Sequence, residues 1–156
     1  MSASTFSADR LQPWIDSLRA RGATLPDDRR ESIGAAAALL AALHSGDAAN
    51  VAATLTDDVV IRITGWTFGG SWEFRGAAAN AAVTDWLDAT GDAIVTMRGD
   101  IDRFYPGVGM LGMDGVWSRL DDGVSMTSRR FGWFLTVVDG RVSAMDLYWS
   151  IHQQSE

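Results

Sequence analysis

The chain has 156 residues and a mass of 16.8 kDa, with 47% hydrophobic and 21% charged residues, which is the size and composition of one globular domain. Its net charge of -7 and pI near 4.7 disfavour nucleic acid or an anionic membrane as a partner, because both would repel an acidic surface. The sequence has no cysteine, which excludes disulfides, thiolate nucleophiles and zinc–thiolate sites and leaves a metal site to carboxylates. It also has no P-loop, dinucleotide or HExxH motif, and we expect no metal and no cofactor. It shows neither a secretory signal nor an apolar run long enough to span a membrane, which predicts a cytoplasmic protein.

Helical spacing of apolar residues predicts four helices, at Ser7–Ala20, Arg29–His44, Ala48–Leu55 and Ala77–Thr90. The second is rich in alanine and leucine, which have the highest helix propensities, and its small side chains let it lie flat on a sheet. Gly46 suits the left-handed position that ends this helix, and Asp47 can cap the short third helix.

Alternating and β-branched residues predict strands at Val59–Thr64, within Gly65–Arg75, and at Ile94–Phe104, Met110–Leu120, Val124–Val138 and Val142–Ile151. Turn residues separate the later strands at Pro106–Gly107, Asp121–Gly123 and Asp139–Gly140. Helices followed by an antiparallel meander predict an α+β domain with helices on one face of the sheet.

Three segments together resemble the NTF2-like superfamily, in particular its SnoaL-like branch: LHSGDAANVAATLTDDVVI, FRGAAA and FLTVVDGRVSAMDLYW. The branch also contains ketosteroid isomerase and limonene-type epoxide hydrolases. The resemblance implies a cone of curved antiparallel sheet, with helices covering its concave face around a pocket, in a homodimer. It assigns residues 27–156 to the SnoaL-like domain and residues 1–26 to an N-terminal helical extension.

The catalytic residues of these two enzymes are replaced in this chain. The tyrosine and the aspartate base of ketosteroid isomerase fall on Leu39 and Ile63, and a tyrosine and an asparagine of the epoxide hydrolases fall on Ile61 and Ile63. The remaining epoxide hydrolase positions, an arginine and two aspartates, fall on Met113, Gly115 and Leu147. None of these replacements can transfer a proton, which counts against both activities at these positions.

The register expected from the turns separates the two faces of the sheet. A three-residue turn at Asp121–Gly123 pairs Trp117 with Thr127, and a three-residue turn around Gly140 pairs Leu135 with Met145. One face is then almost wholly apolar. With residues from the first strand, the following loop and the last helix, it predicts an apolar pocket lined by Ile61, Ile63, Trp66, Val83, Trp86, Met113, Trp117, Phe131, Trp133, Met145, Leu147 and Trp149. The opposite face is mixed and fits solvent or a subunit interface, with charge pairs such as Arg98 with Asp114; it contains Asp114, Arg130, Phe134, Thr136, Asp146 and Tyr148.

Three residues are candidates for catalysis. Neighbours on a strand point to opposite faces, and of Arg129 and Arg130 we expect Arg129 to face inward. A buried guanidinium needs an acceptor, which is either a structural partner such as Glu73 or a ligand carboxylate, enolate or phenolate. Glu73 lies between two aromatic residues, where desolvation would raise its pKa and make it a base; the alternative is a surface strand residue. Asp146 matches the family's last-strand aspartate only if the alignment shifts by one residue.

Two functions remain open from the sequence. The first is a cofactor-independent enzyme that acts on an apolar cyclic metabolite by proton transfer: isomerisation, cyclisation, dehydration or epoxide opening. Arg129 would then stabilise negative charge, and Glu73 or Asp146 would carry the proton. The alternative is a protein that binds a hydrophobic ligand without chemistry. A purely structural dimerisation domain is a third, less favoured reading, because the predicted inner face is so aromatic.

Overall fold

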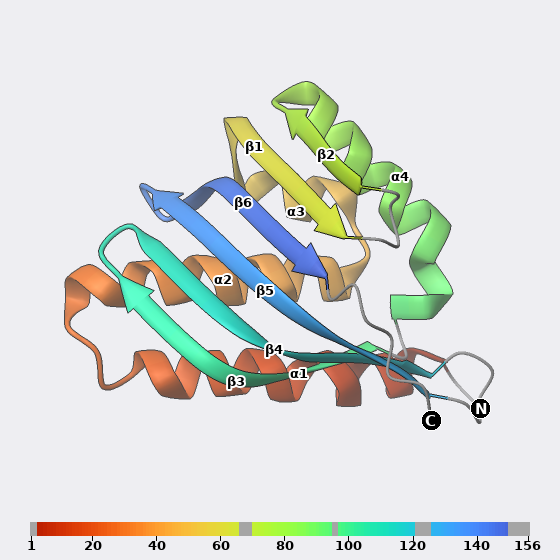
Figure 1. The fold of residues 1–156 in the computed structure, drawn as a ribbon, viewed down its shortest axis with the longest axis horizontal. Helices are drawn as coiled ribbons and strands as arrows, with labels where there is room; N and C mark the ends of the chain where they lie inside the picture. The colour runs from red at the N-terminus through yellow and green to blue at the C-terminus, as the bar shows by residue number, and fades with distance from the viewer. Residues whose placement is uncertain (1–2, 66–69, 95–96, 121–125, 150–156) are drawn as a thin grey trace.

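The computed structural model describes residues 3–65, 70–94, 97–120 and 126–149. Within these ranges it describes only the backbone at 3–11, 13, 44, 65, 70, 86–94, 97–102, 116–120, 126–129 and 149. The helices are α1 (Ala3–Gly22), α2 (Asp27–Ser45), α3 (Ala48–Ala53) and α4 (Ala77–Ile94). The strands are β1 (Leu55–Gly65), β2 (Gly70–Arg75), β3 (Met97–Gly107), β4 (Met110–Leu120), β5 (Met126–Val138) and β6 (Arg141–Trp149) (Figure 1).

The two helix boundaries around Gly46 form as the sequence predicts. Gly46 has a φ of 70° and donates its backbone N–H to the carbonyl of Leu43, which ends α2. The Asp47 carboxylate accepts a 2.9 Å hydrogen bond from the Ala49 N–H and so caps α3. The short helix ends two residues earlier than predicted, because Leu55 already belongs to β1.

The six strands form one sheet in the order β2-β1-β6-β5-β4-β3 (Figure 1). The neighbours pair antiparallel, as expected, except for β1 and β6, which run parallel. The last strand therefore lies between the first strand and β5. This arrangement brings Ile61 beside Met145 and Ile63 beside Leu147, residues that are more than eighty positions apart in the chain.

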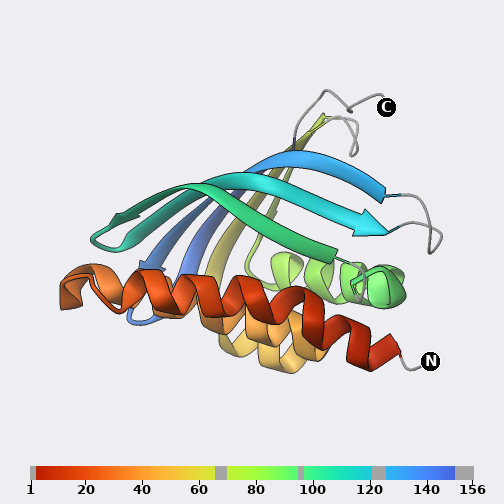
Figure 2. The same ribbon diagram turned by 90° about the horizontal axis from the view of Figure 1, so that it is seen from below.

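The helices cover one face of the sheet, which we call the inner face. Figure 2 shows the sheet curving over the helices, with its concave side toward them. The long helix α2 contributes alanines and leucines to the core, and α1 adds Ile15 and Leu18, which are buried. The molecule is thus an α+β fold with a curved, open sheet, and the helix within residues 1–26 forms part of its core.

The hairpin between β5 and β6 has the predicted register, but its turn is shorter than predicted. Its turn has two residues, Asp139 and Gly140, which have φ angles of 53° and 76°. Positive φ at both positions is the geometry of a type I′ turn, which fits the twist of the strands. A bulge at Ser143 adds one residue to β6, and Leu135 therefore still pairs with Met145 as expected.

The predicted register of β4 with β5 and the predicted position of the β3–β4 turn were both wrong. Trp117 pairs with Arg129 rather than with Thr127, so β5 is shifted by two residues relative to the expectation. A shift of two leaves every side chain on the same face, since strand side chains alternate with a period of two. In the β3–β4 hairpin, Pro106 and Gly107 belong to β3, and the turn is formed by the next two residues.

Within the described part of the chain, no helix combines the length and the apolar character that crossing a membrane requires.

Candidate functional site

The inner face of the sheet is apolar wherever its side chains are described. Among the predicted pocket residues, four are buried and four are partly buried: Ile61, Met113, Phe131 and Trp133, then Ile63, Val83, Met145 and Leu147. The alternation that the sequence predicts is thus confirmed for the seven of these residues that lie on strands, whereas Val83 lies on α4. Trp66 lies outside the described residues, and the side chains of Trp86, Trp117, Arg129 and Trp149 also lie outside them.

The residues that the resemblance aligns with catalytic positions of ketosteroid isomerase and the epoxide hydrolases lie on this face or in the core beneath it. Leu39 on α2 is 1% exposed, and Met113 on β4 is fully buried. Gly115 is also buried, and Leu147 packs against the core beside Ile63. The replacements are therefore apolar groups at the expected places, and they offer no acid or base.

A cluster of three aromatic rings, the aromatic cluster, joins α1 to β5. The ring of Trp14 lies 5.5 Å from that of Phe131 and 6.0 Å from that of Trp133, centroid to centroid. The sequence predicts the apolar stripe of α1 that contains Trp14, but it does not show that this stripe packs on β5. The cluster places three large rings under the middle of the sheet.

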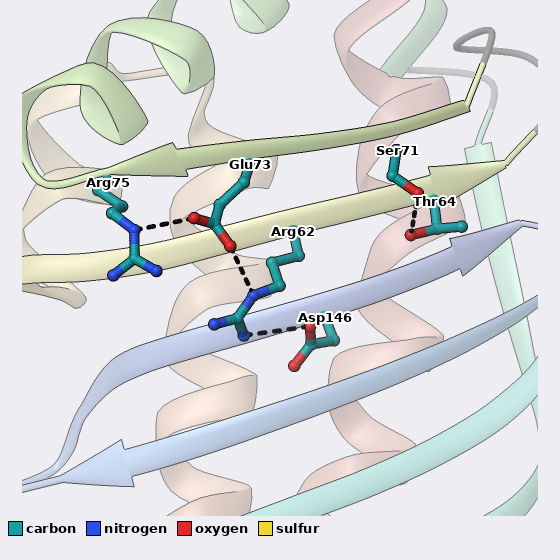
Figure 3. A network of polar contacts seen from close by, with 6 residues as sticks. All are labelled: Arg62, Thr64, Ser71, Glu73, Arg75 and Asp146. Atoms are coloured by element: carbon teal, nitrogen blue, oxygen red, sulfur yellow. Dashed lines mark hydrogen bonds and ion pairs between the residues drawn. The ribbon is translucent and has the colours of Figure 1, made fainter.

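Glu73 and Asp146 lie on the opposite, outer face, where both bind Arg62 (Figure 3). The Arg62 guanidinium donates at 2.9 Å to Glu73 on β2 and at 3.4 Å to Asp146 on β6. Arg75 donates to the other Glu73 oxygen at 2.9 Å. All four side chains belong to the three strands β2, β1 and β6, and they point away from the helices.

The prediction of a raised pKa for Glu73 was wrong. Arg62 lowers the pKa of the Glu73 carboxyl by its hydrogen bond, and Arg75 lowers it further. The same contacts, first from Glu73 and then from Asp146, raise the pKa of Arg62. Glu73 is therefore an ionised partner of two arginines at neutral pH, and not a base in an apolar pocket.

A second ion network lies on the outer face of β3, β4 and β5. Asp114 accepts from Arg103 at 2.9 Å and from Arg130 at 3.4 Å. Arg98, the predicted partner of Asp114, pairs in register with Ser118, and its side chain lies outside the described residues. Arg130 is exposed on this face, which leaves its neighbour Arg129 at a register position of the inner-face set.

Among the described residues, Ser32 is the only polar or charged residue that is buried. Its hydroxyl donates at 2.9 Å to the carbonyl of Arg29 and lies 3.4 Å from the carbonyl of Gly107. This contact ties the start of α2 to the end of β3. Nowhere in the described ranges do three or more His, Asp or Glu side chains gather as they would around a metal ion.

No family model and no curated protein matches the sequence. Solved structures do match, and one is an NTF2-like protein from Burkholderia xenovorans LB400, which is 17% identical with a TM-score of 0.59. The match covers 78% of this chain and 91% of that one. This chain has the NTF2-like fold.

Two further structures with this fold have a named ligand or activity. TerC, crystallised with polyporic acid, is 17% identical, with a TM-score of 0.57 over 77% of this chain and 92% of TerC. The M. tuberculosis LEH-like epoxide hydrolase is 21% identical, with a TM-score of 0.56 over 77% of this chain and 83% of that one. At these identities the likeness establishes the NTF2-like fold alone, and the side chains on the inner face have to supply the argument for function.

Proposed function

We propose that this NTF2-like protein binds an apolar, cyclic small molecule on the inner face of its sheet, without chemistry of its own. The observation that carries the proposal is the apolar lining: the described side chains on this face are aliphatic or aromatic, while the ion pairs gather on the outer face. An apolar ligand gains free energy in such surroundings because it leaves water, and a charged ligand would lose its hydration there. The co-crystallisation of TerC with polyporic acid supports a small-molecule ligand for a protein of this fold.

The test compares two neighbouring residues on β6 that face opposite sides. Leu147 packs against the core, while Tyr148 is exposed on the outer face. Tetralin, a bicyclic hydrocarbon, is titrated into the full chain by isothermal calorimetry. Leu147→Gln should weaken its binding by about tenfold, since a polar amide replaces apolar contact area. Tyr148→Gln should leave the affinity unchanged.

The outcomes are distinct. Equal losses in the two variants would contradict binding on the inner face, and failure of the unmodified protein to bind any apolar ring compound would contradict the proposal itself. The melting temperature of each variant is measured alongside, so that a loss of binding is not confused with a loss of folding.

A second candidate, catalysis by proton transfer, is favoured by the similarity to the M. tuberculosis LEH-like epoxide hydrolase. Under this reading, Arg129 stabilises negative charge that develops on the ligand. The backbone of Arg129 pairs in register with that of Trp117, and this pairing supports an inward position for Arg129 if the alternation of β5 continues from Arg130. A base would have to come from outside the described side chains, since Glu73 and Asp146 are bound to Arg62 on the other face.

The two candidates separate in a proton-exchange experiment. 1-Tetralone has exchangeable hydrogens beside its carbonyl, and NMR in heavy water records their replacement by deuterium. A binding protein leaves the exchange at its rate in buffer. Acceleration that is lost in Arg129→Gln would establish the catalytic reading instead.

A further inference from the structure

The aromatic cluster contains two hydrogen-bond donors for which the described residues provide no acceptor. The Nε1 atoms of Trp14 and Trp133 are both buried and have no hydrogen-bond partner. Trp133 as a whole is 5% exposed, and its indole N–H is out of reach of solvent. An indole N–H can only donate, and buried indole donors in proteins usually find an acceptor.

The surroundings of Trp133 explain why no acceptor is present. On the two neighbouring strands, the residues in register with it are Met113 and Leu147, which have apolar side chains. The carbonyls of β5 are used by the ladders of the sheet on both sides. The third member of the cluster, Phe131, has no acceptor atom in its side chain. The described residues therefore offer the indole N–H no oxygen or nitrogen acceptor, and a bound ligand can supply one.

We infer that the ligand presents an uncharged oxygen, such as a ketone carbonyl, to the indole N–H of Trp133, with Trp14 as a second donor of the same site. The inference rests on the proposed binding function. It specifies that the apolar cyclic ligand also carries a polar, uncharged hydrogen-bond acceptor. A carbonyl oxygen has two lone pairs and can accept from one or both indoles. An amine or ammonium group is disfavoured, since it would place donors against donors.

The polarity of the site follows from the same geometry. An apolar ligand that covers the cluster without offering an acceptor leaves the N–H groups as unpaired as they are in the free protein, and it gains nothing from them. A ketone of the same shape supplies the missing hydrogen bond and gains affinity from it. The protein should therefore distinguish a ring ketone from the matching hydrocarbon, although both fit the apolar lining.

The experiment measures the affinities of the full-length protein for 1-tetralone and for tetralin, which differ by one carbonyl. The decisive quantity is the ratio of the two dissociation constants, tetralin over tetralone, because the cost of removing the ketone from water is the same for every variant. Trp133→Phe keeps an aromatic ring and removes the N–H, and it should lower this ratio by about 5- to 10-fold. Trp14→Phe should lower it as well.

The matched control is Phe131→Leu, which removes aromatic area from the same cluster but no donor. It should weaken both compounds alike and leave the ratio unchanged. Should Trp133→Phe fail to fold, the indole N–H signals of the unmodified protein give a second measurement. Tetralone should move the Trp133 signal downfield in a ¹⁵N–¹H spectrum, whereas tetralin should not.

The inference and the proposed function fail in different ways. If both compounds bind and Trp133→Phe leaves their ratio unchanged, the donor role is overturned while the binding function stands; an N–H directed at the face of the neighbouring ring would give this result. If neither compound binds to the unmodified protein, the binding function is overturned and the donor role falls with it.

Discussion

Arg62 and Glu73 form an ion pair 2.9 Å long across the contact between β1 and β2, on the face of the sheet away from the helices. The same guanidinium reaches Asp146 on β6, so Arg62 connects the strands on both sides of β1. Since both partners are exposed to solvent, the pair contributes little to stability at high salt. The contribution of the ion pair to stability should depend on pH.

The pH dependence follows from the direction of the Glu73 shift. Its pKa in the folded protein is lowered below the ordinary value of 4.5, chiefly by Arg62. The stabilisation is therefore present above pH 4.5 and is lost as the pH falls through the lower, folded pKa. We expect Glu73→Gln to have a lower melting temperature than the unmodified protein at pH 7, and the difference should shrink as the solution is acidified below pH 4.5.

Asp85→Asn is the control for this measurement, because Asp85 is an exposed carboxylate on α4. Its difference from the unmodified protein should stay small at every pH. A difference for Glu73→Gln that grows in acid would contradict the assigned pairing.

Two glycines near α2 should respond in opposite directions to the same substitution. A Cβ at Gly34, inside α2, would have no atom within 4 Å, whereas a Cβ at Gly22 would lie 2.9 Å from Cγ2 of Ile33. Gly34→Ala should stabilise the protein by about 0.5–1 kcal/mol, because alanine loses less backbone entropy in a helix. Gly22→Ala should destabilise it by roughly 1 kcal/mol or more, because the added methyl forces α1 and α2 apart. Chemical denaturation of the two variants checks both signs, and the same sign in both would contradict the close approach at Gly22.

The cap of α3 provides a third test. Asp47→Ala removes the carboxylate that accepts from the Ala49 N–H, and it should lower the free energy of unfolding by about 1 kcal/mol. Asp47→Asn keeps an oxygen in the same place and should be close to the unmodified protein. Comparable losses in the two variants would show that the charge of Asp47, and not the cap, matters.

The outer face carries an exposed pair of aromatic rings, Phe134 and Tyr148, which meet edge to face at 6.0 Å and are 43% and 46% exposed. We propose that a second copy of the chain covers them, since exposed aromatic residues are typical of the centres of interfaces. Phe134→Lys should then weaken the dimer by about 2 kcal/mol or more in sedimentation equilibrium. Val108→Lys, in the β3–β4 turn, should not change it. A monomer at all concentrations of the unmodified protein would refute the pairing.

Alternation along the strands predicts which side chains face the helices, because that property depends only on neighbouring residues. The inward positions of Ile61 and Phe131 and the outward position of Arg130 follow from it, and an error of two residues in the β4–β5 register left them unchanged. Likewise, the predicted pairing of Leu135 with Met145 survived a wrong turn length, because the bulge in β6 supplied the missing residue.

Properties that depend on distant segments were not predictable in the same way. The sequence places Glu73 between two aromatic residues, which suggests an apolar setting, but its environment is set by Arg62 on the neighbouring strand. The contact of Trp14 with Phe131 joins α1 to β5 and has no signal in either segment alone. Hydrophobic periodicity shows that a residue is buried, and only the tertiary structure shows what it touches.

The position of β6 between β1 and β5 has a consequence for the synthesis of the protein. As the chain leaves the ribosome, β1 and β5 both emerge before the strand that has to pair with each of them. Until Arg141–Trp149 follows, these two strands keep unpaired backbone edges that can capture other chains. The sheet therefore cannot close before β6 has been synthesised, and a product that stalls ahead of this strand would need chaperones to keep it from aggregating.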